Sequence, residues 1–116
     1  MTIQEWSDDI TVVELGDDPQ FTDELGALAD RLEEKHANVV LNLAAVSYLN
    51  SSNIARLLRL RKKMMLDDRQ LILCAANSQV RGVFQVTGLD KILRFANDVS
   101  TALAAMQLSQ GPASDE

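Results

Sequence analysis

The chain has 116 residues, of which 47% are hydrophobic and 4% aromatic, and its formal net charge is −6. This length supports one domain with one hydrophobic core. The negative charge argues against general nucleic-acid binding, because phosphate contacts need an excess of Lys and Arg. Cys74 is the one cysteine, which excludes an intrachain disulfide and a metal site built from several thiolates.

The N-terminal residues lack the basic start and the apolar run of a signal peptide. No segment approaches the roughly 20 apolar residues of a membrane span. The sequence therefore predicts a cytoplasmic protein that does not insert into a membrane.

The first third of the chain predicts a strand followed by an amphipathic helix. Residues 10–15 are rich in β-branched side chains and end at Gly16, which is typical of a strand and a turn. After Pro19, apolar side chains recur at helical spacing from Phe21 to Leu32, with acidic residues between them.

Two further strand–helix units follow. Residues 39–43 and 71–75 are short apolar runs of the kind that is buried in a parallel sheet. The cluster Asn50-Ser51-Ser52 offers good N-cap residues for a second helix. Asn77 and Ser78 predict the start of a third helix, which Gly88 ends in the left-handed position usual for glycine.

Near the C-terminus, residues 92–95 predict a short edge strand, and Asn97-Asp98 predicts the start of a last helix. Residues 109–116 lack periodicity and are expected to be disordered, so a single domain is expected over residues 1–108. The alternation of strands and helices predicts an α/β fold with a mainly parallel sheet.

The turn formed by residues 50–53 is the predicted working surface, because it lies where a parallel strand passes into a helix. Ser51 and Ser52 place hydroxyl groups at the positive end of that helix, where a phosphate is tolerated. Two interpretations stay open at this stage: the serines cap the helix, or one of them accepts a phosphate.

The sequence offers few residues that could support catalysis. His36 is the one histidine and lies near the end of the acidic helix, where an imidazolium complements the helix dipole. The pairs Asp17-Asp18 and Asp67-Asp68 fall in predicted turns, where Asp is common for its local hydrogen bonds. We therefore expect no enzyme activity, no cofactor and no metal site.

The second helix concentrates basic residues. Five of the eleven lie within eight positions: Arg56, Arg59, Arg61, Lys62 and Lys63. By helical spacing, Arg56, Arg59 and Lys63 form one stripe roughly opposite the apolar arc. The stripe is either a solvated face or an interaction surface for an acidic partner. The stem of Arg61 is expected to pack within the apolar arc while its head reaches water.

The segment VVLNLAAVSYLNSSNI (39–54) resembles the signature of STAS domains, specifically bacterial anti-sigma-factor antagonists. The segment LILCAANSQVRGVFQVTGLDKILRF (71–95) resembles the second half of the same domain. The resemblance covers roughly residues 10–106. It is weak over residues 17–21, where the family usually has a Gly-x-Leu/Ile-Asp turn.

The resemblance implies a four- or five-stranded, mostly parallel sheet with about four helices mainly on one side. It also implies partner switching, in which the antagonist binds an ATPase-fold serine kinase that is itself an anti-sigma factor. The kinase phosphorylates the antagonist, and a serine phosphatase reverses this. The family's acceptor serine falls on Ser51, its preceding aspartate on Asn50, and its glycine on Asn53.

We therefore expect Ser51 as the phosphoacceptor, with Ser52 as second choice. The expected partner-binding residues are Asn50, Ser51, Ser52, Asn53, Ile54 and Arg56. Asn50 lacks the family's negative charge, and Asn53 adds a side chain where the family leaves open space. The alternative is a STAS adaptor or subunit that works without phosphorylation, for example a transporter-associated component. The oligomeric state stays open between a monomer and a weak dimer.

Overall fold

The computed structural model describes residues 3–110, and residues 1–2 and 111–116 lie outside the described part. The elements in chain order are β1 (Ile3–Glu5), β2 (Ile10–Gly16), α1 (Gln20–Glu34), β3 (Asn38–Ala45), α2 (Ser51–Leu66), β4 (Leu71–Cys74), α3 (Ser78–Val86), the 3-10 helix η1 (Leu89–Lys91), β5 (Arg94–Ala96) and α4 (Val99–Gln110).

The strands form one five-stranded sheet in the order β1-β2-β3-β4-β5. β1 pairs antiparallel with β2, and the other neighbours pair in parallel. The predicted α/β fold with a mainly parallel sheet is confirmed, and so is the five-stranded option.

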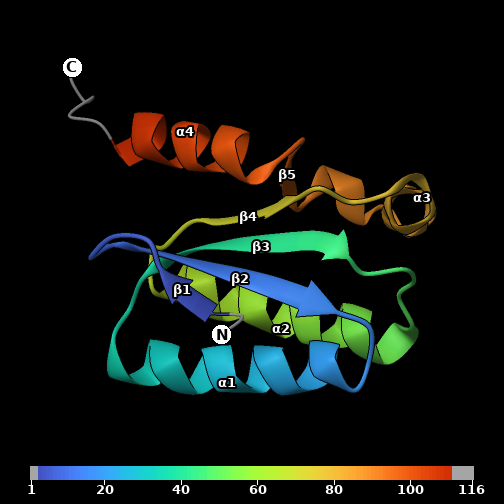
Figure 1. Cartoon of the computed structure of the whole chain (residues 1–116), viewed down its shortest axis with the longest axis horizontal. Helices are drawn as coiled ribbons and strands as arrows, with labels where there is room; N and C mark the ends of the chain where they lie inside the picture. The colour runs from blue at the N-terminus through green and yellow to red at the C-terminus, as the bar shows by residue number, and fades with distance from the viewer. Residues whose placement is uncertain (1–2, 111–116) are drawn as a thin grey trace.

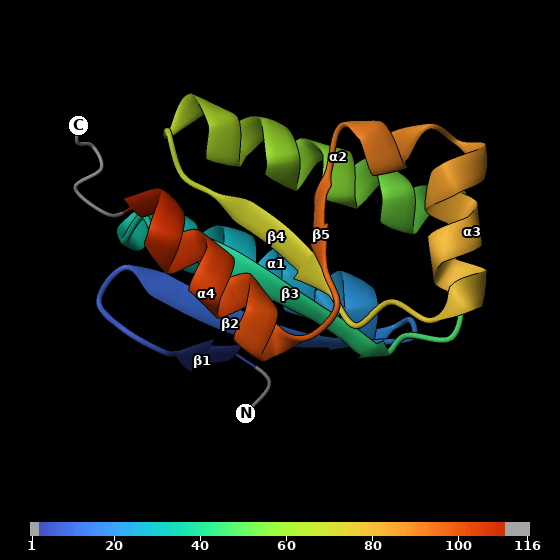
Figure 2. The ribbon, with the colours of Figure 1, turned by 90° about the horizontal axis from the view of Figure 1, so that it is seen from above.

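The helices lie on both faces of the sheet but unequally. α1 and α2 cover one face, whereas α4 lies on the other (Figure 1). The buried side chains of α3, Val80 and Phe84, belong to the same core cluster as those of α1 and α2. Seen from above, α4 lies along the sheet at an oblique angle to β2 and β3, and α3 lies beyond the carboxyl ends of β3 and β4 (Figure 2). Three of the four helices thus share the larger core, which agrees with the helices mainly on one side that the resemblance implies.

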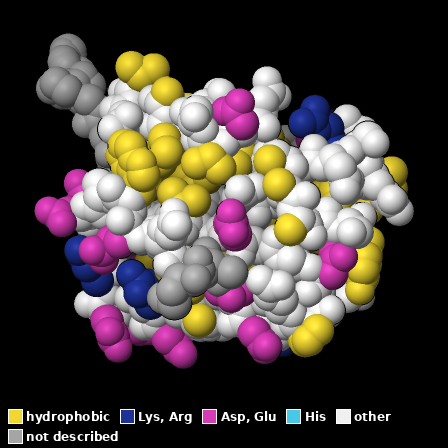
Figure 3. All heavy atoms as spheres, viewed as in Figure 1, with side chains coloured by type: hydrophobic (Ala, Val, Ile, Leu, Met, Phe, Trp, Pro, Cys, Tyr) yellow, Lys and Arg dark blue, Asp and Glu magenta, His cyan; other side chains and the backbone are white. Residues whose placement is uncertain are grey.

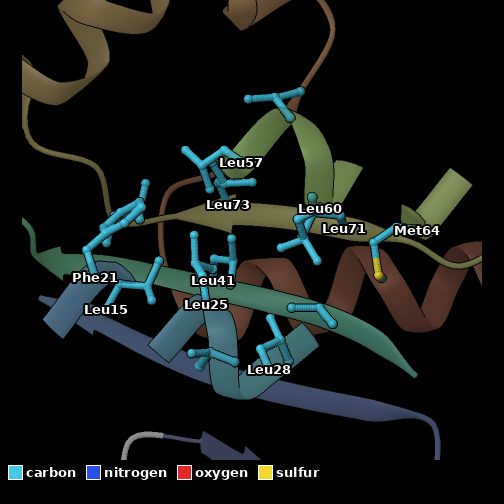
Figure 4. Packing of buried hydrophobic residues seen from close by; sticks show 14 of the residues in the cluster. Leu15, Phe21, Leu25, Leu28, Leu41, Leu57, Leu60, Met64, Leu71 and Leu73 are labelled. Atoms are coloured by element: carbon cyan, nitrogen blue, oxygen red, sulfur yellow. The ribbon is translucent and has the colours of Figure 1, made fainter. Parts of the chain in front are cut away.

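The two faces follow from the alternation of side chains along each strand. In β3, Val39 and Leu41 belong to the core beneath α1 and α2, and Val40 belongs to the smaller core beneath α4. Figure 4 shows Leu41 and Leu73 of the sheet among side chains of α1 and α2. A space-filling view shows acidic side chains along the outer side of α1 and hydrophobic ones gathered near α4 (Figure 3).

The C-terminal part departs from the prediction in two places. β5 is formed by Arg94–Ala96 and not by residues 92–95. Gly88 adopts a left-handed φ of 78° and begins η1, and the Leu93 N–H donates to the Leu89 carbonyl at 2.9 Å, so the chain turns before it can extend. α4 also continues to Gln110, two residues into the segment expected to be disordered; residues 111–116 lie outside the described residues.

Candidate functional site

The turn at residues 50–53 is a reciprocal capping box at the start of α2. The Asn53 N–H donates to Asn50 Oδ1 at 2.8 Å, and the Asn50 N–H donates to Asn53 Oδ1 at 3.1 Å. Asn50 is extended, with φ −106° and ψ 174°, as an N-cap residue requires. Two asparagines thus close the end of the helix, and neither serine is needed as the cap.

Ser51 and Ser52 are the first two residues of α2, and both are exposed. At these positions the backbone N–H groups have no partner within the helix, and the helix dipole favours negative charge. A hydroxyl placed here is accessible to a partner, and a phosphate on it would meet a favourable local field.

Asp18 brings a carboxylate to this turn from a different segment, the loop between β2 and α1. Its Oδ2 accepts hydrogen bonds from Asn53 Nδ2 at 2.9 Å and from Asn50 Nδ2 at 3.3 Å. Its Oδ1 accepts two bonds from Thr22, from Oγ1 at 2.7 Å and from the N–H at 3.0 Å. One carboxylate therefore joins the starts of α1 and α2.

This arrangement keeps Asp18 ionised over a wide pH range. The hydrogen bonds from Thr22, and next that from Asn53, lower the pKa of Asp18 to about 2. The family's aspartate is absent at position 50, yet a negative charge still lies beside the turn, because Asp18 supplies it.

The loop that leads from β3 to the turn is held on two sides. Asp17 Oδ1 accepts the Ser47 N–H at 2.7 Å. Asn77 Nδ2, at the start of α3, donates to the Val46 carbonyl at 3.1 Å. Asn77 also caps α3 by accepting the Val80 N–H, as its sequence position predicted. These contacts fix the turn against the segments that follow β2, β3 and β4.

Asp17 and Asp18 are the site residues that the sequence reasoning missed. The sequence predicts turn residues with local hydrogen bonds here, which describes the Thr22 contacts but not those with Ser47, Asn50 and Asn53. A signal was available, because both residues follow directly after β2, and the carboxyl ends of neighbouring parallel strands meet at one edge of the sheet.

The expected partner-binding residues do not all reach the surface. Asn50, Ser51 and Ser52 are exposed, and Ile54 and Arg56 are half-buried. Asn53 is only 1% exposed, so its side chain does not extend into the open space of the turn. Its role is to hold the turn together. Tyr48, three residues before Ser51, is 47% exposed and adds an aromatic side chain that the sequence reasoning did not include.

The basic stripe of α2 lies along the side of the helix that borders α1. Arg56, Arg59 and Lys63 line a groove of about 180 Å³ between α2 and α1. Lys63 Nζ pairs with Glu33 Oε2 of α1 at 2.7 Å. Arg56 Nε is buried and, among the described residues, has no hydrogen-bond partner.

Among residues 3–110, no helix combines the length and apolar character needed to cross a membrane.

A family model described as STAS domain matches residues 7–102. The chain is 31% identical over 96 residues to BtrV of Bordetella bronchiseptica, which bears the name putative anti-sigma factor antagonist. That match covers 83% of this chain and 80% of BtrV.

Two solved structures show the same fold at low sequence identity. TM1081 of Thermotoga maritima superposes with a TM-score of 0.81 at 16% identity, covering 90% of this chain and 92% of the other. The phosphorylated form of SpoIIAA, a Bacillus cell fate determinant, superposes with a TM-score of 0.70 at 17% identity, covering 89% and 96%.

Proposed function

Because the chain belongs to the STAS domain family and is similar to anti-sigma factor antagonists, we propose that it regulates transcription by partner switching. In this proposal it binds an ATPase-fold serine kinase that is itself an anti-sigma factor, and so frees the sigma factor. The binding surface is the turn at residues 50–53 with the first turns of α2.

The observation that carries the proposal is the pair of exposed serines on a turn whose neighbours are fixed by hydrogen bonds. Ser51 is the proposed phosphoacceptor, with Ser52 as second choice. The phosphorylated form of SpoIIAA supports the assignment, since a protein of the same fold accepts this modification. Asp18 supports it as well, because it supplies a carboxylate where the family's aspartate is replaced by Asn50.

The proposed switch is electrostatic. A phosphate on Ser51 adds about two negative charges to the surface that the partner contacts. The start of α2 tolerates those charges through its dipole, so the domain stays folded while the surface that the partner contacts becomes more negative. A phosphatase that removes the phosphate restores binding.

The proposed contact surface combines one aromatic side chain, two small hydroxyl side chains and one cation: Tyr48, Ser51, Ser52 and Arg56. Tyr and Arg are, with Trp, enriched among the residues that dominate the affinity of protein interfaces. Asn53 supports this surface from beneath, because its buried side chain bonds both Asn50 and Asp18.

A second function, that of a STAS adaptor that is not phosphorylated, is favoured by the capping box. Asn50, Asn53 and Asp18 satisfy one another and fix the turn without any added phosphate. Such an adaptor would use the same surface to hold another assembly together, for example one associated with a transporter.

The test is to incubate the purified chain with its cognate serine kinase and ATP and to measure intact mass and complex formation by gel filtration. We expect a complex, a mass increase of one phosphate group, and loss of that increase in Ser51→Ala. The matched control is Ser52→Ala, which leaves the acceptor in place. A complex without any mass increase favours the adaptor, and the absence of both results refutes partner switching.

A further inference from the structure

A second surface of different chemistry lies toward the other end of α2. A groove of about 320 Å³ runs between the C-terminal half of α2, the start of β4 and the start of β5. We call it the α2–β5 groove; it is lined by Arg61, Met64, Met65, Arg69, Gln70, Leu71, Ile92, Leu93 and Arg94. It has no part in the turn at residues 50–53.

The floor of the groove is apolar. Met64, Leu71 and Leu93 are buried beneath it. At its margin, Met65 is 61% exposed and Ile92 is 45% exposed. Exposed hydrophobic side chains next to one another mark interaction sites more often than isolated ones do.

The charged lining of the groove is entirely positive. Three of the seven arginines in the chain line it, and no acidic residue does. Among residues 3–110, no carboxylate forms an ion pair with Arg61, Arg69 or Arg94. The lining thus has a local positive charge in a chain whose 17 acidic residues outnumber its 11 basic ones.

Two of the three guanidinium groups are held in position. Arg61 Nε donates to the Ile92 carbonyl at 3.1 Å, and Arg94 Nη1 donates to Gln70 Oε1 at 2.9 Å. Each bond uses one of the five N–H donors of a guanidinium. Arg61 therefore does more than extend to water as predicted; it ties α2 to the segment before β5.

We propose that the α2–β5 groove binds a short acidic segment of a partner protein, with one apolar side chain on the groove floor and flanking carboxylates on the arginines. Charge complementarity selects this occupant. The net charge of −6 disfavours a long polyanion such as nucleic acid, whereas a short peptide meets mainly the local positive field. This goes beyond the proposed function, because it adds a binding site on a separate surface.

The two sites can be occupied together. Asn50 and Arg61 are eleven positions apart along α2, which corresponds to roughly 16 Å of helix rise. A partner whose contacts stay at the turn and the first turns of α2 therefore leaves the groove open. The chain would then hold two proteins at once, and phosphorylation of the turn would release only one of them.

The test is an NMR titration of the isotope-labelled full chain with the peptide acetyl-Glu-Asp-Leu-Leu-Glu-Asp-amide. We expect saturable shifts of the amides of Arg61, Arg69, Ile92 and Arg94, and weaker binding as salt rises from about 0.01 M to about 0.3 M. The matched neutral peptide acetyl-Gln-Asn-Leu-Leu-Gln-Asn-amide should bind at least about tenfold more weakly. Equal binding of both peptides, or shifts outside the groove, would overturn the proposal.

Two double variants distinguish binding by the groove arginines from an effect of the chain's net charge. Arg69→Gln/Arg94→Gln should weaken binding of the acidic peptide about tenfold, because each lost pair contributes modestly at a partly exposed site. Arg59→Gln/Lys62→Gln removes the same charge from outside the groove and should change affinity less than about twofold. Equal losses of peptide affinity in both variants would show that net charge alone determines binding, and this would overturn the proposal.

Other occupants give distinguishable results. Inorganic phosphate at matched ionic strength should leave the groove amides unchanged, and the same shifts with phosphate would assign a simple anion site. Tighter peptide binding after removal of residues 111–116 would assign the groove to the chain's own acidic end. Concentration-dependent shifts of the groove amides without peptide would assign it to a second copy. Each of these results contradicts a partner segment.

Discussion

The polar side chains at the two ends of α2 differ in whether they find partners within the chain. At the N-terminal end, the side chains of Asn50 and Asn53 bond each other and Asp18, so the turn satisfies itself. At the C-terminal end, Arg61, Arg69 and Arg94 surround an apolar floor without any carboxylate among the lining residues. The hydrogen bonds at the N-terminal end fix the conformation of the turn. The arginines at the C-terminal end have no carboxylate partner among residues 3–110, so their charge can interact with a ligand. A self-satisfied turn suits a switch that must survive modification, and unpaired cations suit binding.

The largest expected effect comes from breaking the turn at its buried member. Asn53→Ala removes half of the capping box and the bond to Asp18, and it should lower the free energy of unfolding by about 2 kcal/mol. Urea denaturation followed by circular dichroism measures this. Ser52→Ala, at the adjacent exposed position, is the control and should change stability by less than about 0.5 kcal/mol. Similar costs at both positions would contradict the capping role of Asn53.

A smaller effect is expected from restoring the family's aspartate. Asp caps a helix as well as Asn does, but Asn50→Asp replaces an amide donor that lies 3.3 Å from Asp18 Oδ2 with a second carboxylate. Repulsion should lower the urea midpoint at neutral pH, though less than Asn53→Ala does. Adding Asp18→Asn should recover most of the loss, because one carboxylate and one amide then face each other again. No recovery in the double variant would show that the two positions are not coupled.

The pH dependence of stability should report on Asp18 directly. Its pKa is lowered to about 2 in the folded chain, against about 3.9 for an unperturbed Asp. The stabilisation is therefore complete above about pH 4 and is lost as the pH falls through 2. The difference in melting temperature between the native chain and Asp18→Asn should narrow over this range. A constant difference from pH 6 to pH 2 would show that the charge of Asp18 does not matter.

The smallest effect on stability is expected at the other end of α2. The Arg69 side chain has no hydrogen bond or ion pair among the described residues, so Arg69→Gln should change the free energy of unfolding by less than about 0.5 kcal/mol. The same denaturation experiment measures it beside Asn53→Ala. A cost near that of Asn53→Ala would mean that the groove arginines serve the fold, and the contrast between the two ends would fail.

Much of the fold could be predicted from local patterns. The apolar runs at β3 and β4, the cap at Asn77 and the left-handed Gly88 were placed correctly, because each depends on the residue itself or on close neighbours. The segment at residues 92–95 was misplaced, because an apolar run does not tell where a turn gives way to a strand. The 3-10 helix η1 occupies the space before β5 and shifts the strand toward Ala96.

The position of the candidate site in the chain could be predicted, but the hydrogen bonds and the burial of its side chains could not. The strand-to-helix junction at residues 50–53 followed from the order of the elements and the N-cap residues. The burial of Asn53 did not follow, because an asparagine in the first turn of a helix can point either way. Only the packing of α1 beside α2, with Asp18 between their starts, turns it inward.

The sequence by itself determined the order of strands and helices, the family, and the two serines as candidates for modification. These depend on side-chain type, spacing and local hydrogen bonding, which are written into neighbouring residues. The tertiary structure alone decided that Asp18 meets Asn50 and Asn53 across more than thirty positions. It also decided that three arginines, from α2, the α2–β4 connection and β5, gather around one groove. Both depend on the crossover connections of a parallel sheet, which bring distant segments together at its two ends.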